Sequence, residues 1–286
     1  MNRRSRLLTF AVAACAPVAG FLVAGAPVAA HAASPSASAH AAAIARNFVR
    51  HLSVGQHGTN HTVATDHMMI NGLNQVQSTN WSGYANDNSS GNTYSAVSAK
   101  WTEPTGTCTS TTSLAAFWVG IDGYTSDSVE QDGTLIECYE RSVYYFSWWE
   151  MYPTNSIQVV GESVRPGDAI TASVTRSGSS YTLKVTDSTH TANSFTETES
   201  CSSCANSSAE WIAEAPSGSS GVYPLTQFGT WSASSAAVTS GSTNGVISSF
   251  PDDELTMVDS SGNVKAQPGS LNGSGNGFSV TWERSS

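Results

Sequence analysis

Histidine is nearly absent from most of this sequence. Beyond His67 the chain contains a single histidine, His190, although it has seven in all. His190 lies in a Ser/Thr-rich stretch that predicts a turn, and no GxSxG or HExxH motif occurs anywhere. The Asp-Thr-Gly or Asp-Ser-Gly signature of pepsin-like aspartic peptidases is missing too. We therefore expect neither a histidine-activated nucleophile nor a metal site, and no organic cofactor.

Basic residues are also scarce. Beyond residue 75 the chain has seven Lys and Arg residues against 21 Asp and Glu residues, which gives a net charge of −14 at neutral pH. Binding to nucleic acid depends on neutralising phosphates, so we expect no nucleic-acid partner. At about pH 3 most carboxylates are neutral, and only a few positive charges remain to repel one another. This composition suits an acidic environment, although ordinary acidic solubility explains it equally well.

The only long apolar run lies at the N-terminus. It extends over residues 7–30, follows Arg3, Arg4 and Arg6, and ends in the small residues around Ala32. The run is long enough for a membrane-spanning helix, but its proline, glycine and alanine content favours a cleaved signal peptide over residues 1–32. We therefore expect a secreted, extracellular protein with no membrane association after cleavage.

Residues 33–75 differ in composition from the rest. They contain five histidines and no Trp, Cys or Tyr, and only residues 41–52 have the pattern of a short helix. We interpret this segment as a propeptide that acid releases from the active site, because histidine gains its charge near pH 6.5. A disordered linker is the alternative. The remaining residues, 76–286, are enough for one domain with a sizeable core.

Four cysteines follow the predicted signal peptide. An even number in an exported chain favours disulfide bonds, and we expect Cys108–Cys138 and Cys201–Cys204 among three possible pairings. The CxxC spacing of the second pair also occurs in zinc and redox sites. No second CxxC and no nearby histidine supports a metal here.

The pattern of residues 76–286 predicts an all-β domain. Short runs rich in Val, Thr, Tyr, Trp and Phe alternate with Gly, Ser, Asn and Asp clusters, and helical periodicity is almost absent. Strands at this spacing indicate a β-sandwich or a barrel. The Ser/Gly-rich stretches are expected to be loops, at residues 217–221 and 232–249. Strands are expected at residues 81–85, 94–102, 114–121, 133–139, 144–152, 169–176, 181–187, 210–213, 227–231, 254–258 and 278–282.

Four segments concentrate carboxylates, amides and aromatic rings. They are NWSGY (80–84), FWVGIDG (117–123) with VEQDG (129–133), SWWEMYP (147–153) and AEWIAEA (209–215). Alternate residues of a strand share a face, so Glu150 lies with Trp148 and Tyr152, and Glu214 lies with Glu210. A carboxylate beside aromatic rings is partly desolvated, which raises its pKa towards values useful for acid–base catalysis. For each segment alone, core tryptophans and solvent-facing glutamates are the simpler interpretation.

Taken together, the four segments resemble the glutamic peptidases, the eqolisin family, over nearly the whole chain from about residue 80. The resemblance implies a two-sheet antiparallel β-sandwich of the lectin-like, concanavalin-like kind. It also implies an endopeptidase that acts on polypeptides, with Gln131 and Glu214 as the catalytic pair. Further residues match positions that line or support the substrate cleft in that family, which are Trp81, Trp118, Asp122, Trp148, Glu150 and Tyr152.

The mechanism implied by the resemblance uses Glu214 as the general base for a water molecule and the Gln131 amide as the oxyanion donor. Glu210 is the competing candidate for the base. The chain departs from the family pattern at Asp132, in the length of the loop before Gln131, and at Ala215, so the details of the subsites stay open.

Two other functions fit a sandwich with carboxylates and tryptophans. A glycoside hydrolase would use Glu150 and Glu214 as its two carboxyl groups, about 5 Å apart for a retaining mechanism. A non-catalytic lectin-like or protein-binding module would need only the aromatic face. We favour the peptidase, and we expect it to be a monomer.

Overall fold

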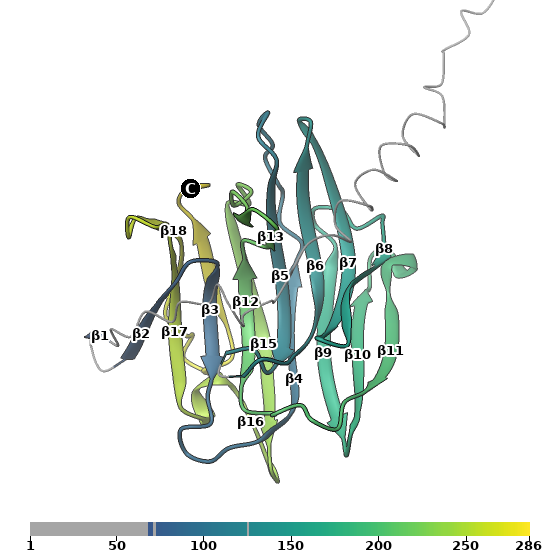
Figure 1. The fold of residues 1–286 in the computed structure, drawn as a ribbon, viewed down its shortest axis with the longest axis vertical. Helices are drawn as coiled ribbons and strands as arrows, with labels where there is room; N and C mark the ends of the chain where they lie inside the picture. The colour runs from purple at the N-terminus through teal and green to yellow at the C-terminus, as the bar shows by residue number, and fades with distance from the viewer. Residues whose placement is uncertain (1–67, 71–72, 125) are drawn as a thin grey trace, which may run out of the picture.

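The computed structural model describes residues 68–70, 73–124 and 126–286, which form two packed β-sheets (Figure 1). The predicted signal peptide, most of the predicted propeptide and the predicted helix at residues 41–52 lie outside the described residues. The strands β1 (Met68–Ile70) and β2 (Leu73–Ser78) already belong to a sheet, although they begin before residue 76. No helix among the described residues is long and apolar enough to cross a membrane.

The front sheet is the one that carries the four motif segments. Its strands are antiparallel except for the parallel pair β2–β17. From one edge to the other they are β8 (Asn155–Gly161), β7 (Ser142–Tyr152), β6 (Val129–Tyr139), β5 (Ser113–Ile121), β12 (Ala209–Glu214), β3 (Trp81–Asn86), β17 (Asp252–Val258), β2 and β1.

The back sheet covers one face of the front sheet. In order its strands are β11 (Phe195–Ser200), β10 (Ser180–Asp187), β9 (Ala169–Ser177), β4 (Tyr94–Thr102), β15 (Thr230–Ser240) and β16 (Thr243–Gly245). The first residues of β15 instead pair with β19 (Phe278–Trp282), which leads through β18 (Val264–Pro268) to β17. The long strand β15 therefore joins the two sheets at one side.

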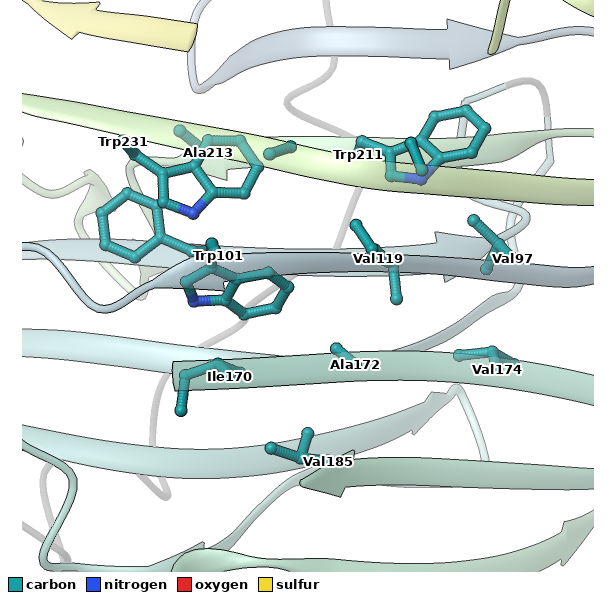
Figure 2. Close-up of a cluster of buried hydrophobic side chains, with 14 of the residues drawn as sticks. Val97, Trp101, Val119, Ile170, Ala172, Val174, Val185, Trp211, Ala213 and Trp231 are labelled. Atoms are coloured by element: carbon teal, nitrogen blue, oxygen red, sulfur yellow. The ribbon is translucent and has the colours of Figure 1, made fainter. Parts of the chain in front are cut away.

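The main core lies between the sheets, where alternate residues of each strand point. Figure 2 shows Val119 and Trp211 of the front sheet among Val97 and Ala172 of the back sheet. Trp231 belongs to the same core and stacks on a phenylalanine ring of β5 with centroids 5.4 Å apart. Burying one large apolar side chain stabilises the fold by about 1.5–3 kcal/mol, so this layer holds the sheets together.

The prediction of a loop at residues 232–249 was wrong. This stretch forms most of β15, the short strand β16 and a 3₁₀ turn at Ile247–Ser249. Its core-facing residues are small, such as Ala233 and Val238, and exposed serines alternate with them. A bulge at Ser235, where φ is 52°, interrupts the alternation. The predicted strand at 227–231 accordingly begins only at Thr230.

Other differences are smaller. Residues 217–221 were expected to be loop, and they carry a short hairpin of β13 (Ser217–Gly218) with β14 (Gly221–Val222). The strands β8, β11 and β18 were not predicted. The structure confirms both expected disulfide bonds, Cys108–Cys138 and Cys201–Cys204.

Candidate active site

The candidate site lies on the face of the front sheet that points away from the back sheet. The strands β12, β5, β6 and β7 lie side by side there, in that order. Their residues on this face, together with Trp81 of β3, form a second buried cluster, separate from the main core, that includes Trp118, Trp148 and Ile212. Both members of the predicted catalytic pair lie on this same face, Gln131 on β6 and Glu214 at the end of β12.

Gln131 is held by its neighbours across the sheet. It lies opposite Gly120 of β5 on one side and opposite Glu150 of β7 on the other. Its Nε2 donates a 2.8 Å hydrogen bond to Oε2 of Glu150. A Cβ atom at residue 120 would lie 2.9 Å from the Trp118 ring and 3.2 Å from Cβ of Gln131. The glycine therefore gives both side chains the space that they occupy.

Glu214 accepts hydrogen bonds from an indole and an amide, and neither group titrates in acid. The indole Nε1 of Trp118 donates to its Oε2 at 2.8 Å, and Nδ2 of Asn80 donates to its Oε1 at 3.3 Å. Asn80 lies in the turn between β2 and β3, one residue before Trp81. Sequence reasoning included Asn80 in a motif segment but gave it no role. Its position next to the tryptophan was the only signal.

Glu150 interacts with both members of the predicted catalytic pair, Gln131 and Glu214. Its side chain is fully buried, and burial raises its pKa well above the ordinary value of a glutamate. The hydrogen bond from Gln131 lowers this pKa, and the charge of Glu214 raises it. All three side chains lie on the same face of the sheet.

Glu210 fits the role of base less well. It shares the face with Glu214 and lies in the same cross-strand row as Gln131, with Gly120 between them. Burial raises its pKa well above the ordinary value, and the charge of Asp122 adds to this. The charge of Glu214 acts on Glu150, and the charge of Asp122 acts on Glu210. Glu214 instead accepts hydrogen bonds from Trp118 and Asn80, which favour its charged form.

Asp122 supports the strand that carries Glu214. Its backbone is left-handed, with φ at 69°, and its side chain is buried. The two carboxylate oxygens accept backbone hydrogen bonds of 2.7 Å from Asn206 and Ser207. These residues lie three and two positions before the start of β12 at Ala209, so Asp122 fixes the segment that leads into that strand.

The remaining predicted cleft residues are aromatic. Trp81 packs edge-on against Trp118, with ring centroids 4.9 Å apart and the planes at 73°. Trp148 lies in one cross-strand row with Trp118, and Gly133 lies between them. Tyr152 ends β7 on the face of Glu150 and is partly exposed. The structure therefore brings all of these rings to the same face as Gln131 and Glu214.

His190 lies elsewhere, beside the end of β10 in the back sheet. Its Nδ1 lies 2.7 Å from Oδ1 of Asp168, and Asp187 accepts its backbone N–H at 2.7 Å. These three side chains form a group whose ligand atoms lie within 4.8 Å of one another. Since backbone N–H groups already bind the carboxylates, the group holds the loop together.

The chain matches the sequence model of the Peptidase A4 family over residues 79–280. The chain belongs to the Peptidase A4 family. No curated protein matches it. Its structure is similar to scytalido-glutamic peptidase bound to a transition-state analogue inhibitor, with 24% identity, a TM-score of 0.60, and coverage of 72% of this chain and 98% of that one. It is also similar to SCP-B, described as a member of the eqolisin family in complex with the tripeptide Ala-Ile-His, with 23% identity, a TM-score of 0.58 and the same coverage.

A third similar structure is aspergilloglutamic peptidase from Aspergillus niger, with 28% identity and a TM-score of 0.50 over 59% of this chain and 99% of that one. These Peptidase A4 relatives confirm the fold class, a β-sandwich, and the resemblance noted from the motifs. The protein is a glutamic-type peptidase. The glycoside hydrolase and the non-catalytic binding module are thereby set aside.

Proposed function

We propose that this glutamic peptidase is a secreted, acid-active endopeptidase in which Glu214 activates the attacking water and Gln131 stabilises the oxyanion. One observation carries the proposal. Gln131 hydrogen-bonds Glu150, and Gln131, Glu150 and Glu214 all lie on one face of the sheet, so an amide donor and a carboxylate share that face. That pair of groups is what water-mediated hydrolysis of an amide requires.

The chemistry begins with ionised Glu214, which accepts a proton from a water molecule as the water oxygen attacks the scissile carbonyl carbon. The carbonyl oxygen becomes an oxyanion and accepts an N–H from Nε2 of Gln131. An amide nitrogen carries two hydrogens, so Gln131 can serve Glu150 and the oxyanion together. Glu214 then gives its proton to the leaving nitrogen as the C–N bond breaks, and a carboxylic acid and an amine are released.

An amide suits this role in acid because it does not titrate there. One preorganised oxyanion donor is worth about 3 kcal/mol of transition-state stabilisation. The two groups that donate hydrogen bonds to Glu214 are an indole and an amide, and neither of them titrates in acid. The site therefore depends on the ionisation of carboxyl groups alone, which suits a working pH well below neutral.

Secretion rests on the sequence. The basic start, the apolar run and the small residues near Ala32 are those of a signal peptide, and the histidine-rich segment after them suits a propeptide. The two disulfide bonds fit an oxidising compartment. Polypeptides are the proposed substrates, and a monomer is the proposed state.

The test is proteolysis of casein at acid pH by the mature enzyme and by Gln131→Ala, Glu214→Ala and Glu214→Gln. We expect each variant to lose about 10²-fold or more of kcat while circular dichroism shows an unchanged fold. Glu283→Gln, a substitution at an exposed position on the last strand's C-terminal side, is the matched control and should keep full activity. A Glu214→Ala variant with wild-type kcat would rule out the proposed base.

A further inference from the structure

We propose that Glu150 works as a neutral acid that fixes the amide of Gln131 for catalysis, and that its ionisation ends activity on the alkaline side. The inference rests on the proposed roles of Gln131 and Glu214. It gives Glu150 a positioning role and makes it the second titrating group of the site.

The pairing of β6 with β7 places the side chains of Gln131 and Glu150 next to each other. Gln131 and Glu150 are directly opposite each other in the β6–β7 pair, so neither depends on a loop for its position. Nε2 of Gln131 donates to Glu150 at 2.8 Å, and the backbone N–H of Ile157 on β8 also approaches this carboxyl group. With the nitrogen of the amide turned towards Glu150, the second N–H of the same nitrogen has a defined direction. A rotating amide would present either its oxygen or its nitrogen to the substrate.

The surroundings keep Glu150 uncharged. From the facing elements, β6 presents the neutral Gln131 and β8 presents a backbone N–H. The strand β12 presents Glu214 and also Glu210, which lies in the same cross-strand row as Gln131. On its own strand the same face carries Trp148 and Tyr152. The Glu150 side chain has an exposure of 0%, which favours its neutral form, and the charge of Glu214 opposes a second charge beside it. With Glu150 neutral, the one negative charge of the pair belongs on Glu214, which accepts hydrogen bonds from Trp118 and Asn80.

This arrangement has a direct effect on the oxyanion. A neutral Glu150 accepts the Gln131 N–H without placing a negative charge beside the position where the transition state develops one. Once Glu150 ionises, two carboxylates flank that position and oppose the developing charge. The rate should therefore rise as the pair loses its first proton and fall as it loses its second, so both limbs of the pH–rate profile belong to the pair.

The experiment measures kcat and KM from pH 2 to pH 8 for wild type, Glu150→Gln and Glu150→Ala. Glu150→Gln retains an acceptor for Gln131 and cannot ionise, so we expect kcat within about tenfold of wild type and an alkaline limb that moves up by about one pH unit or more. Glu150→Ala removes the acceptor, and we expect kcat to fall about 10²- to 10³-fold while KM changes by no more than about threefold.

Glu137→Gln is the matched control. Glu137 is a fully buried carboxyl group on the same face of β6, but it lies opposite Tyr144 and not beside Gln131. Its variant should leave the alkaline limb in place. Circular dichroism at each pH separates loss of activity from loss of fold, and Glu150→Asp, which titrates, should retain an alkaline limb if Glu150→Gln folds poorly.

Two outcomes would overturn the inference. One is a Glu150→Gln profile that superimposes on that of wild type, and the other is wild-type kcat in Glu150→Ala. Either result leaves the proposed function intact, provided that Glu214→Gln is inactive. An active Glu214→Gln enzyme would instead overturn the function on which the inference rests.

Discussion

The indole of Trp118 donates a 2.8 Å hydrogen bond to Oε2 of Glu214 across the β5–β12 pair. Trp118 lies opposite Ile212 in the register, two residues before Glu214, so the ring reaches diagonally along the strand. The same ring packs against Trp81 and over Gly120. A tryptophan that the sequence assigned to the cleft therefore donates a hydrogen bond directly to the proposed base.

Replacing Trp118 with phenylalanine should move the acid limb of the pH–rate profile to higher pH. The variant retains the ring but removes the donor, so the ionised form of Glu214 loses stabilisation of about 1.5–3 kcal/mol. Below the optimum, kcat/KM should fall by about tenfold or more. Trp148→Phe is the control, because Nε1 of Trp148 is buried without a hydrogen bond. Its acid limb should stay where it is, and an unmoved limb in Trp118→Phe would contradict the prediction.

Stability should fall as the pH rises from about 5 to about 8. Burial raises the pKa of Glu103 to about 8 and that of Glu130 to about 10, and it raises the pKa of Asp132 well above normal. In the unfolded chain these groups ionise near pH 4, so in this range the unfolded state binds fewer protons than the folded state. The free energy of unfolding then decreases with pH, by at most about 1.4 kcal/mol per group per pH unit.

Thermal unfolding followed at several pH values tests this. Glu103→Gln should flatten the dependence, because glutamine can accept the hydrogen bonds that Trp101 and Thr134 now donate to Glu103 and does not ionise. A melting temperature that stays constant or rises between pH 5 and pH 8 would show that the buried carboxyl groups do not control stability.

Strands with β-branched and aromatic residues were predictable from the sequence. The bounds of β4 and β19 match the prediction residue for residue. The start of β6 was missed, because Glu130, Gln131 and Asp132 are three consecutive polar residues that resemble a loop. All three are fully buried in the structure, where the outer face holds the amide and the inner face holds carboxyl groups with raised pKa values. The expected link between polar residues and loops fails here because all three polar side chains are buried within a strand.

The candidate site was only partly predictable. Alternation along a strand already gave the shared face of Glu150 with Trp148, and of Glu214 with Glu210. That these two faces are one face depends on β12 pairing with β5, far away in the sequence. A single sequence contains no signal for such long-range pairing or for its register. The prediction that Gln131 and Glu214 form a pair came instead from the resemblance to the glutamic peptidases.

Removing the Cys108–Cys138 disulfide should cost more stability than removing Cys201–Cys204. The first closes a loop with a separation of 30 residues, and the second a loop with a separation of 3. The chain-entropy estimate is about 3–4 kcal/mol for the longer loop and about 2 kcal/mol for the shorter one. Urea unfolding of the two double Cys→Ser variants gives the comparison. The reverse order would mean that the CxxC link fixes the segment before β12 more strongly than loop length predicts.

Gly133→Ala should strongly destabilise the protein, because Gly133 holds β5 and β6 close together under two tryptophans. A Cβ atom there would clash with the carbonyl oxygen of Phe117 and lie 2.8 Å from Cα of Trp118. Both obstacles are backbone atoms, so relief requires the strands to separate, at a cost of about 3 kcal/mol or more. The displaced Trp118 would also lose its alignment with Glu214, so the folded fraction should have a reduced kcat.

Gly273→Ala provides the control for the loss of glycine itself. Its added Cβ meets no heavy atom within 4 Å, so the free energy of unfolding should change by no more than about 0.5 kcal/mol. Urea unfolding monitored by tryptophan fluorescence compares the two variants with wild type. If Gly133→Ala were as stable as Gly273→Ala, the close approach of β5 and β6 would not be required. The alignment of Trp118 with Glu214 would then have to come from the packing of Trp81 and not from the spacing of the strands.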